Sequence, residues 1–143
     1  MDTPSESVCD LCSSAGGELL WQGLLCRVVL VDDADYPGFC RVILSRHVSE
    51  LTDLTWDESR LLYETVWNVE RAVRFVLKSD KVNVASLGNV TPHVHWHVIP
   101  RFHNDRHFPR PIWAEPLRDR IELELPADLS AVLKDAVTRF QVP

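Results

Sequence analysis

Three histidines occur at alternate positions, His93, His95 and His97, in the segment His-Val-His-Trp-His-Val-Ile of residues 93–99. On a β-strand, alternate residues point to the same face, so the pattern predicts three imidazoles on one face and apolar side chains on the other. A neutral imidazole is a nucleophile near pH 7, and neighbouring rings can donate hydrogen bonds to phosphate oxygens as negative charge develops there. The segment therefore predicts attack by a histidine on the phosphorus of an elongated anionic substrate.

The same spacing argues against a metal centre made of these three histidines. At about 3.3 Å per residue, the Cα atoms of His93 and His97 lie roughly 13 Å apart on a strand. That separation is too large for three imidazoles to bind one ion comfortably. A metal-dependent hydrolase centred on this segment is thus disfavoured, and a solvated strand rich in histidine, without chemistry, is the remaining alternative.

The elements that must hold this segment are readable from hydrophobic spacing. Short runs rich in β-branched residues, bounded by turn-forming residues, predict strands over 25–31, 39–44, 82–87 and 93–99. Apolar residues spaced by three and four predict a long amphipathic helix over 56–78 and a second helical stripe over 129–140. The sequence therefore predicts an α+β domain in which one principal helix lies on one face of a small antiparallel sheet.

A capping motif predicts where the long helix begins, and three tryptophans are candidates for the core or an interface. Thr55 and Glu58 have the spacing of a capping box, which predicts that the long helix begins just after Thr55. We expect Trp21, Trp56 and Trp67 to fill the core or an interface rather than to bind a base.

Composition limits the possible partners. The 143 residues suit one domain, and a formal charge of −6 argues against a general nucleic-acid or anionic-membrane surface. No uncharged apolar run reaches the roughly 18 to 20 residues that span a bilayer. The acidic amino terminus lacks the basic-then-apolar order of a signal peptide, so we expect a cytoplasmic protein with no nucleic-acid or membrane partner.

The four cysteines fall into two kinds. Cys9 and Cys12 form a Cys-x-x-Cys pair, which in a reducing compartment indicates either a metal-binding knuckle or free thiols. Cys26 and Cys40 lie within apolar runs and are expected to be core residues.

The segment His-Val-His-Trp-His-Val-Ile-Pro resembles the signature of the histidine-triad (HIT) family. Other matching residues follow in the family's order: the Cys-x-x-Cys pair, Asp32 and Asp33 before Pro37-Gly38, Arg46-His47 with Leu51 and Asp53-Leu54, Gly88-Asn89, and Pro100-Arg101. The resemblance implies one HIT domain over 1–143, with its core at about 9–101 and a carboxy-terminal loop and helix over 102–143. It also implies an antiparallel five-stranded sheet with one long helix and a C-terminal helix, and a homodimer whose two sheets join.

The resemblance also implies catalytic and substrate-binding roles. His95 would attack the α-phosphorus and form a nucleotidyl-histidine, which water would then cleave. His97 would hydrogen-bond the phosphoryl oxygens and help protonate the leaving group, and His93 completes the triad. Asp32 or Asp33 would bind the ribose hydroxyls. Asn89, where many members carry glutamine, would bind a phosphate. The sequence departs from the family's pattern just before Asn89, where the loop is shortened to residues 82–88, and Asn83 in that stretch is a further candidate for binding the phosphates.

Some members bind a structural zinc ion, and the corresponding ligands here are Cys9, Cys12, His47 and His93. A zinc-bound His93 would support the site and would not act as an acid or base, because its lone pair is committed to the ion. No organic cofactor is implied. Disordered thiols, or ligands that do not retain the metal, are the alternatives.

The implied function is hydrolysis of dinucleoside polyphosphates or nucleoside phosphoramidates, with adenine as the expected base. Transfer of the nucleotidyl group to an acceptor other than water and slow-turnover nucleotide sensing are the alternatives. The segment from Phe102 to Trp113 contains arginines suited to phosphate and the ring of Trp113, which could stack on a base. It either reaches over the site or packs on a dimer partner, and the second is the prediction.

Overall fold

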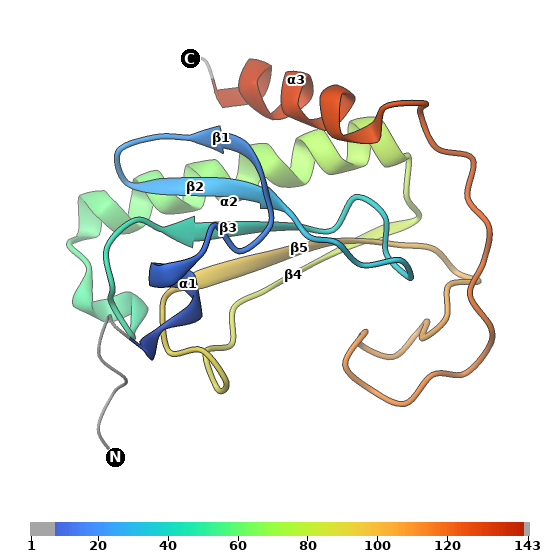
Figure 1. The fold of residues 1–143 in the computed structure, drawn as a ribbon, viewed down its shortest axis with the longest axis horizontal. Coiled ribbons are helices and arrows are strands. Elements are labelled where there is room, and N and C mark those ends of the chain that lie inside the picture. Colours follow the sequence, from blue (N-terminus) through green and yellow to red (C-terminus); the bar gives the residue numbers. More distant parts are fainter. Residues whose placement is uncertain (1–7, 142–143) are drawn as a thin grey trace.

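The computed structural model describes residues 8–141 and contains one five-stranded sheet with helices on both of its faces (Figure 1). The strands are β1 (Glu18–Gln22), β2 (Cys26–Leu30), β3 (Cys40–Leu44), β4 (Lys81–Ala85) and β5 (His95–Arg101). All neighbours pair antiparallel, in the order β1-β2-β3-β5-β4. The predicted α+β class and the five-stranded sheet are confirmed.

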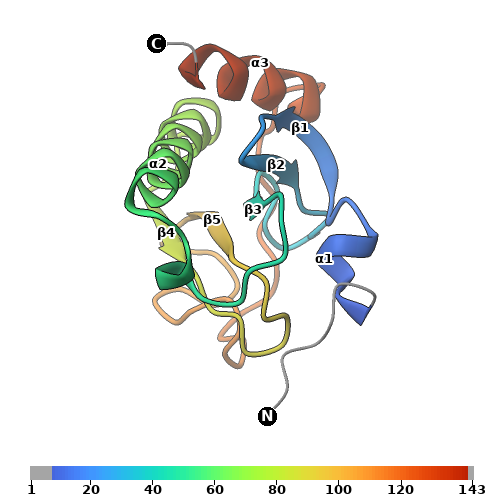
Figure 2. The ribbon, with the colours of Figure 1, turned by 90° about the vertical axis from the view of Figure 1, so that its left-hand side faces the viewer.

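Two helices cover one face of the sheet, and a short one lies on the other (Figure 2). The long helix α2 (Trp56–Leu77) and the C-terminal helix α3 (Leu129–Gln141) pack on each other, while the short helix α1 (Asp10–Ser13) lies on the opposite side. The predicted capping box is present, because Thr55 accepts from the Glu58 amide and the Glu58 carboxylate accepts from the Thr55 amide. Such a cap contributes about 1 kcal/mol.

The main core lies between the sheet and these two helices. Alternate strand residues such as Val28, Val42 and Val98 are fully buried there against Leu62 of α2 and Leu133 of α3. The two cysteines expected in the core, Cys26 and Cys40, belong to the same cluster. The opposite face of the sheet, which the two long helices leave uncovered, carries the histidines.

The structure shifts one predicted strand, adds another and narrows the expectation for two tryptophans. The last predicted strand, 93–99, is displaced to His95–Arg101, because the His93 amide donates to the Thr91 carbonyl in a turn while the strand's far end continues along β4. Strand β1 was not predicted from the residue pattern. Trp56 and Trp67 are 82% and 70% exposed, so they do not fill the core, and their place in an interface stays a prediction.

Residues 102–128 form no regular helix or strand, and they run around one end of the sheet before α3 begins (Figure 1). No helix within residues 8–141 combines the length and the apolar character needed to cross a membrane.

Candidate active site and metal centre

His95 is the first residue of β5 and is held in one tautomer by the backbone. Its Nδ1 lies 2.6 Å from the carbonyl oxygen of His93. A carbonyl can only accept, so Nδ1 carries the proton and Nε2 keeps its lone pair. Burial lowers the pKa of His95, the hydrogen bond to His93 opposes this, and the charge of Arg41 lowers it further. His95 is therefore a neutral imidazole with a free Nε2, which is the form that attacks phosphorus.

His97 lies beside His95 on the same face of the sheet. The two ring centroids are 4.9 Å apart, and the His97 ring stacks on Phe39 and meets the edge of Trp113. Burial, together with the nearby His95 and Arg41, lowers the pKa of His97 to about 4. Its Nδ1 is shielded from solvent and has no partner within residues 8–141. Because the protein does not fix its tautomer, His97 can present an N–H to a phosphate oxygen.

Four side chains from three parts of the chain form a candidate metal centre. Cys9 is the N-cap of α1 and Cys12 lies within that helix, while His47 follows β3 and His93 precedes β5. Their ligand atoms all lie within 4.8 Å of one another. The His93 Nδ1 is 3.5 Å from the Cys9 sulfur and 3.4 Å from the Cys12 sulfur, and the His47 Nδ1 is 3.4 Å from the Cys12 sulfur. Ligands around tetrahedral zinc are separated by about 3.5 Å, so this Cys₂His₂ set fits the ion.

His93 connects the metal centre to His95. Its Nε2–H donates to the Leu44 carbonyl at 2.7 Å, which leaves Nδ1 available for a metal. Its backbone carbonyl orients His95. His93 is therefore placed as a positioning residue. The expectation that it shares a strand with His95 and His97 is wrong, because β5 begins at His95.

The four residues expected to bind substrate are placed differently from one another. Asp32 and Asp33 follow β2, where Asp32 is exposed and the Asp33 carboxylate accepts from the Asp35 amide at 2.9 Å. Asn83 lies on β4 opposite Ile99, and its side-chain oxygen accepts from Arg101 at 2.6 Å. Asn89 is exposed in the loop before β5. Their roles toward substrate stay predictions.

Arg41 is a residue that the sequence analysis missed. It lies on β3 directly opposite His97, so both side chains share the histidine face. With His95 and Gly16, it lines a cavity of about 420 Å³. The available signal was a charged residue in an otherwise apolar strand, Cys40–Leu44, which indicates a strand face that is not core.

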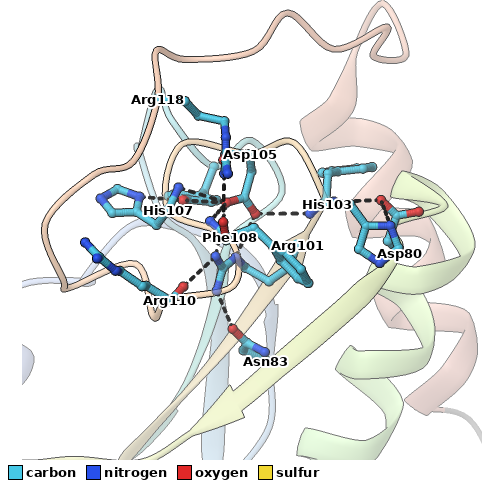
Figure 3. Close-up of polar contacts among 11 residues, drawn as sticks. Asp80, Asn83, Arg101, His103, Asp105, His107, Phe108, Arg110 and Arg118 are labelled. Carbon is cyan, nitrogen blue, oxygen red and sulfur yellow. Dashed lines mark hydrogen bonds and ion pairs between the residues drawn. The ribbon is translucent and has the colours of Figure 1, made fainter.

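A second missed feature is the network around Asp105 (Figure 3). Its carboxylate accepts two bonds from the Arg101 guanidinium, at 2.8 and 3.1 Å, and others from the Tyr36 hydroxyl and the amides of Phe102, His107 and Phe108. Burial raises the pKa of Asp105, but the bonds from Arg101 and these amides outweigh it and hold the pKa at about 2. Because both charged groups are only 2% exposed, this ion pair fixes the start of segment 102–128.

The same segment brings Trp113 to the active site. The Trp113 ring centroid is 5.1 Å from that of His97, and neighbouring Ile112 packs with Tyr36, Phe39 and Ile99. The segment thus lies on its own sheet and contributes one wall beside His97. Packing on a dimer partner stays a prediction.

Comparison with known proteins gives relatives with named activities. The sequence model of the HIT domain matches residues 17–104. The chain is 35% identical over 72 residues to a bis(5'-adenosyl)-triphosphatase of Saccharomyces cerevisiae, covering 46% of this chain and 35% of that protein. It is 32% identical over 102 residues to an AP-4-A phosphorylase of Mycobacterium tuberculosis, covering 67% of this chain and 52% of that protein. The chain therefore spans between about a third and a half of these relatives' length.

Solved structures match over most of their length. A histidine triad protein from Bradyrhizobium japonicum has a TM-score of 0.68 at 29% identity, covering 85% of this chain and 90% of that one. One from Marinobacter aquaeolei VT8 has a TM-score of 0.73 at 25% identity, covering 88% and 92%. A zinc-bound family protein from Mycobacterium smegmatis, at 21% identity with a TM-score of 0.67 and coverage of 94% and 96%, shares the fold.

Proposed function

We propose, from the premise that this chain belongs to the HIT family, that it cleaves dinucleoside polyphosphates at the α-phosphorus with His95 as the nucleophile. The observation that carries the proposal is the hydrogen bond from His95 Nδ1 to the His93 carbonyl, which leaves Nε2 free beside a cavity. The activities named for the yeast and mycobacterial relatives support this substrate class. We expect adenine as the base, and nucleoside phosphoramidates are the second substrate class.

The reaction has two displacements. His95 Nε2 forms a bond to the α-phosphorus, and the bond to the bridging oxygen of the leaving polyphosphate breaks. The ring becomes positively charged, and the His93 carbonyl stabilises that charge through the Nδ1–H bond. His97 donates a hydrogen bond to the phosphoryl oxygens, or helps protonate the leaving group. Water then attacks the phosphorus, the P–N bond breaks with its electron pair returning to Nε2, and a nucleoside monophosphate, neutral His95 and the proton lost by the water are released.

A second candidate is transfer of the nucleotidyl group to inorganic phosphate. Its support is the mycobacterial relative, which is named as a phosphorylase. The products distinguish the two reactions, because water as acceptor yields a nucleoside monophosphate whereas phosphate yields a nucleoside diphosphate. Diphosphate formed from diadenosine tetraphosphate only when phosphate is present, with no monophosphate, would favour the transferase.

The test is single turnover with excess protein and α-labelled diadenosine tetraphosphate, quenched in alkali because phosphorylated histidine is labile to acid. We expect label on the protein at early times and labelled monophosphate later. Binding without labelled protein or product would instead identify a slow nucleotide-binding protein. A parallel reaction with adenosine phosphoramidate compares the two substrate classes.

We also propose that Cys9, Cys12, His47 and His93 hold a structural zinc ion that fastens α1 to the sheet, supported by the tetrahedral spacing of their ligand atoms. Because such thiolates need a reducing compartment, we propose a cytoplasmic location, which cell fractionation tests. Purified protein is expected to contain about one zinc per chain.

In the zinc test, Cys9→Ser should lose most of the metal and lower the unfolding midpoint. Cys26→Ser is the control and should keep the zinc, since Cys26 is buried among core residues on the helix side. Less than about 0.1 zinc per chain in the wild type would contradict the proposal.

A homodimer is the third proposal. Strand β4 ends the sheet with a free edge, and beside it Tyr63, Trp67 and Val84 are exposed apolar side chains that line a cavity of about 460 Å³. A free edge flanked by exposed aromatic residues indicates an interface. Light scattering should give twice the chain mass of 16.4 kDa.

The double variant Trp67→Glu, Val84→Lys should shift the scattering mass to that of one chain, because charges would be buried at the joined edges. Leu24→Glu, at a fully exposed position between β1 and β2, should leave the mass unchanged. A wild type of about 16 kDa would remove the dimer.

A further inference from the structure

Arg41 is a cation on the histidine face whose charge the protein leaves largely unpaired. Its NH1 donates to the Gly16 carbonyl at 3.4 Å, and its guanidinium lies 5.5 Å from the Phe39 ring centroid. Its Nε is shielded from solvent without a partner, and no carboxylate within residues 8–141 forms an ion pair with it. Arg27, on the neighbouring strand, instead donates three bonds of 2.7–3.0 Å to backbone carbonyls.

An unpaired guanidinium at a half-buried position is unfavourable unless an anion joins it. Burial lowers the pKa of Arg41, and the charge of Asp33 opposes this. Arginine nevertheless stays protonated in proteins, so the position keeps its charge. Its donors are suited to phosphate oxygens, which they bind as charge-assisted hydrogen bonds.

His95 lines a cavity that contains Arg41 and another that does not, and the two differ in charge. The cavity of about 420 Å³ contains Arg41, with Asp10 also among its lining residues. The other, of about 280 Å³, contains Glu50 and no lysine or arginine. A phosphate chain whose first phosphorus is at His95 would meet only the repulsion of Glu50 in the smaller cavity, whereas in the larger one the attraction of Arg41 opposes the repulsion of Asp10. Arg41 also faces His97 across the β3–β5 pairing.

We propose that Arg41 binds the phosphates beyond the α-phosphate and makes this site selective for dinucleoside polyphosphates over nucleoside phosphoramidates. The inference rests on the proposed function. A phosphoramidate has a single phosphorus, which His95 and His97 engage, so it offers Arg41 no further anion. A polyphosphate offers several negative oxygens along its chain, and Arg41 is the cation placed to receive them.

The test compares kcat/KM for diadenosine tetraphosphate and adenosine phosphoramidate in Arg41→Met and Arg41→Lys. Loss of one charge-assisted contact should lower kcat/KM for the polyphosphate about 10- to 100-fold in Arg41→Met, with less than about 3-fold change for the phosphoramidate. Arg41→Lys should fall between the wild type and Arg41→Met. Arg139→Met, an exposed arginine on α3, is the matched control and should change neither substrate. Thermal unfolding checks that each variant folds.

An equal fall for both substrates, or no fall for either, would overturn the inference and leave the hydrolase proposal standing. If the wild type cleaves neither substrate, the proposed function fails, and calorimetric binding of ATP and AMP decides the inference separately. Weaker ATP binding in Arg41→Met, with AMP binding unchanged, supports Arg41 as the phosphate-chain residue. Equal effects on the two nucleotides count against it.

Discussion

Replacing His95 with glutamine is expected to lower kcat/KM for diadenosine tetraphosphate by about 10⁴-fold or more, because the variant has no nucleophilic nitrogen. A glutamine amide can still donate to the His93 carbonyl, so the buried acceptor is not left unpaired. Binding of the substrate should therefore persist while the chemical step is lost. Steady-state rates combined with calorimetric binding separate these two effects.

The matched control is His103→Gln, which alters a histidine outside the site. The His103 side chain is 73% exposed, and its Nδ1 lies 3.6 Å from Asp80 (Figure 3). We expect this variant to remain within about 2-fold of wild type. If His95→Gln kept more than a tenth of the wild-type rate, or still formed the labelled intermediate, His95 would not be the nucleophile.

Changing Asp105 to asparagine is expected to lower the free energy of unfolding by about 3–5 kcal/mol, the cost of breaking a buried ion pair on one side. Arg101 would keep its charge at a position that is only 2% exposed, without its carboxylate partner. The amides of Phe102, His107 and Phe108 would also lose a charged acceptor. Chemical unfolding at neutral pH measures the change.

The same substitution should also affect activity, since Asp105 holds the segment that carries Trp113 to His97. Asp135→Asn, which removes an exposed ion pair with Arg139 on α3, is the control and should cost no more than about 0.5 kcal/mol. Equal stabilities for the Asp105 and Asp135 variants would show that the network around Asp105 is not holding the segment in place.

Much of the fold follows from local sequence patterns. The helix Trp56–Leu77 was predicted because its apolar residues repeat at three and four and because Thr55 and Glu58 cap it, which are both local signals. Strands β2 and β3 were predicted as β-branched runs on either side of turn-forming residues, and they pair antiparallel with each other. Strand β1 was missed because its five residues, Glu-Leu-Leu-Trp-Gln, do not alternate, and its pairing with β2 contains a register irregularity.

In the candidate site, too, some features follow from the local sequence and others only from the tertiary structure. The sequence by itself determined that His95 and His97 share a strand face, because a period of two depends only on the backbone. It also supplied the four metal-ligand types, although their approach to within 4.8 Å depends on α1 folding across the sheet. The tautomer of His95 was decided only in three dimensions, by a turn that places the His93 carbonyl against its Nδ1.

Arg41 and Asp105 were decided by tertiary structure alone. Arg41 lies within the predicted strand 39–44, but its position opposite His97 arises because β3 pairs with a strand more than fifty residues later. Asp105 gathers its partners from a distant loop, from β5 and from its own segment. Spacing along the chain reveals which side chains can share an element, whereas the pairing of distant elements, driven by burial of their apolar faces, selects which charges finally meet.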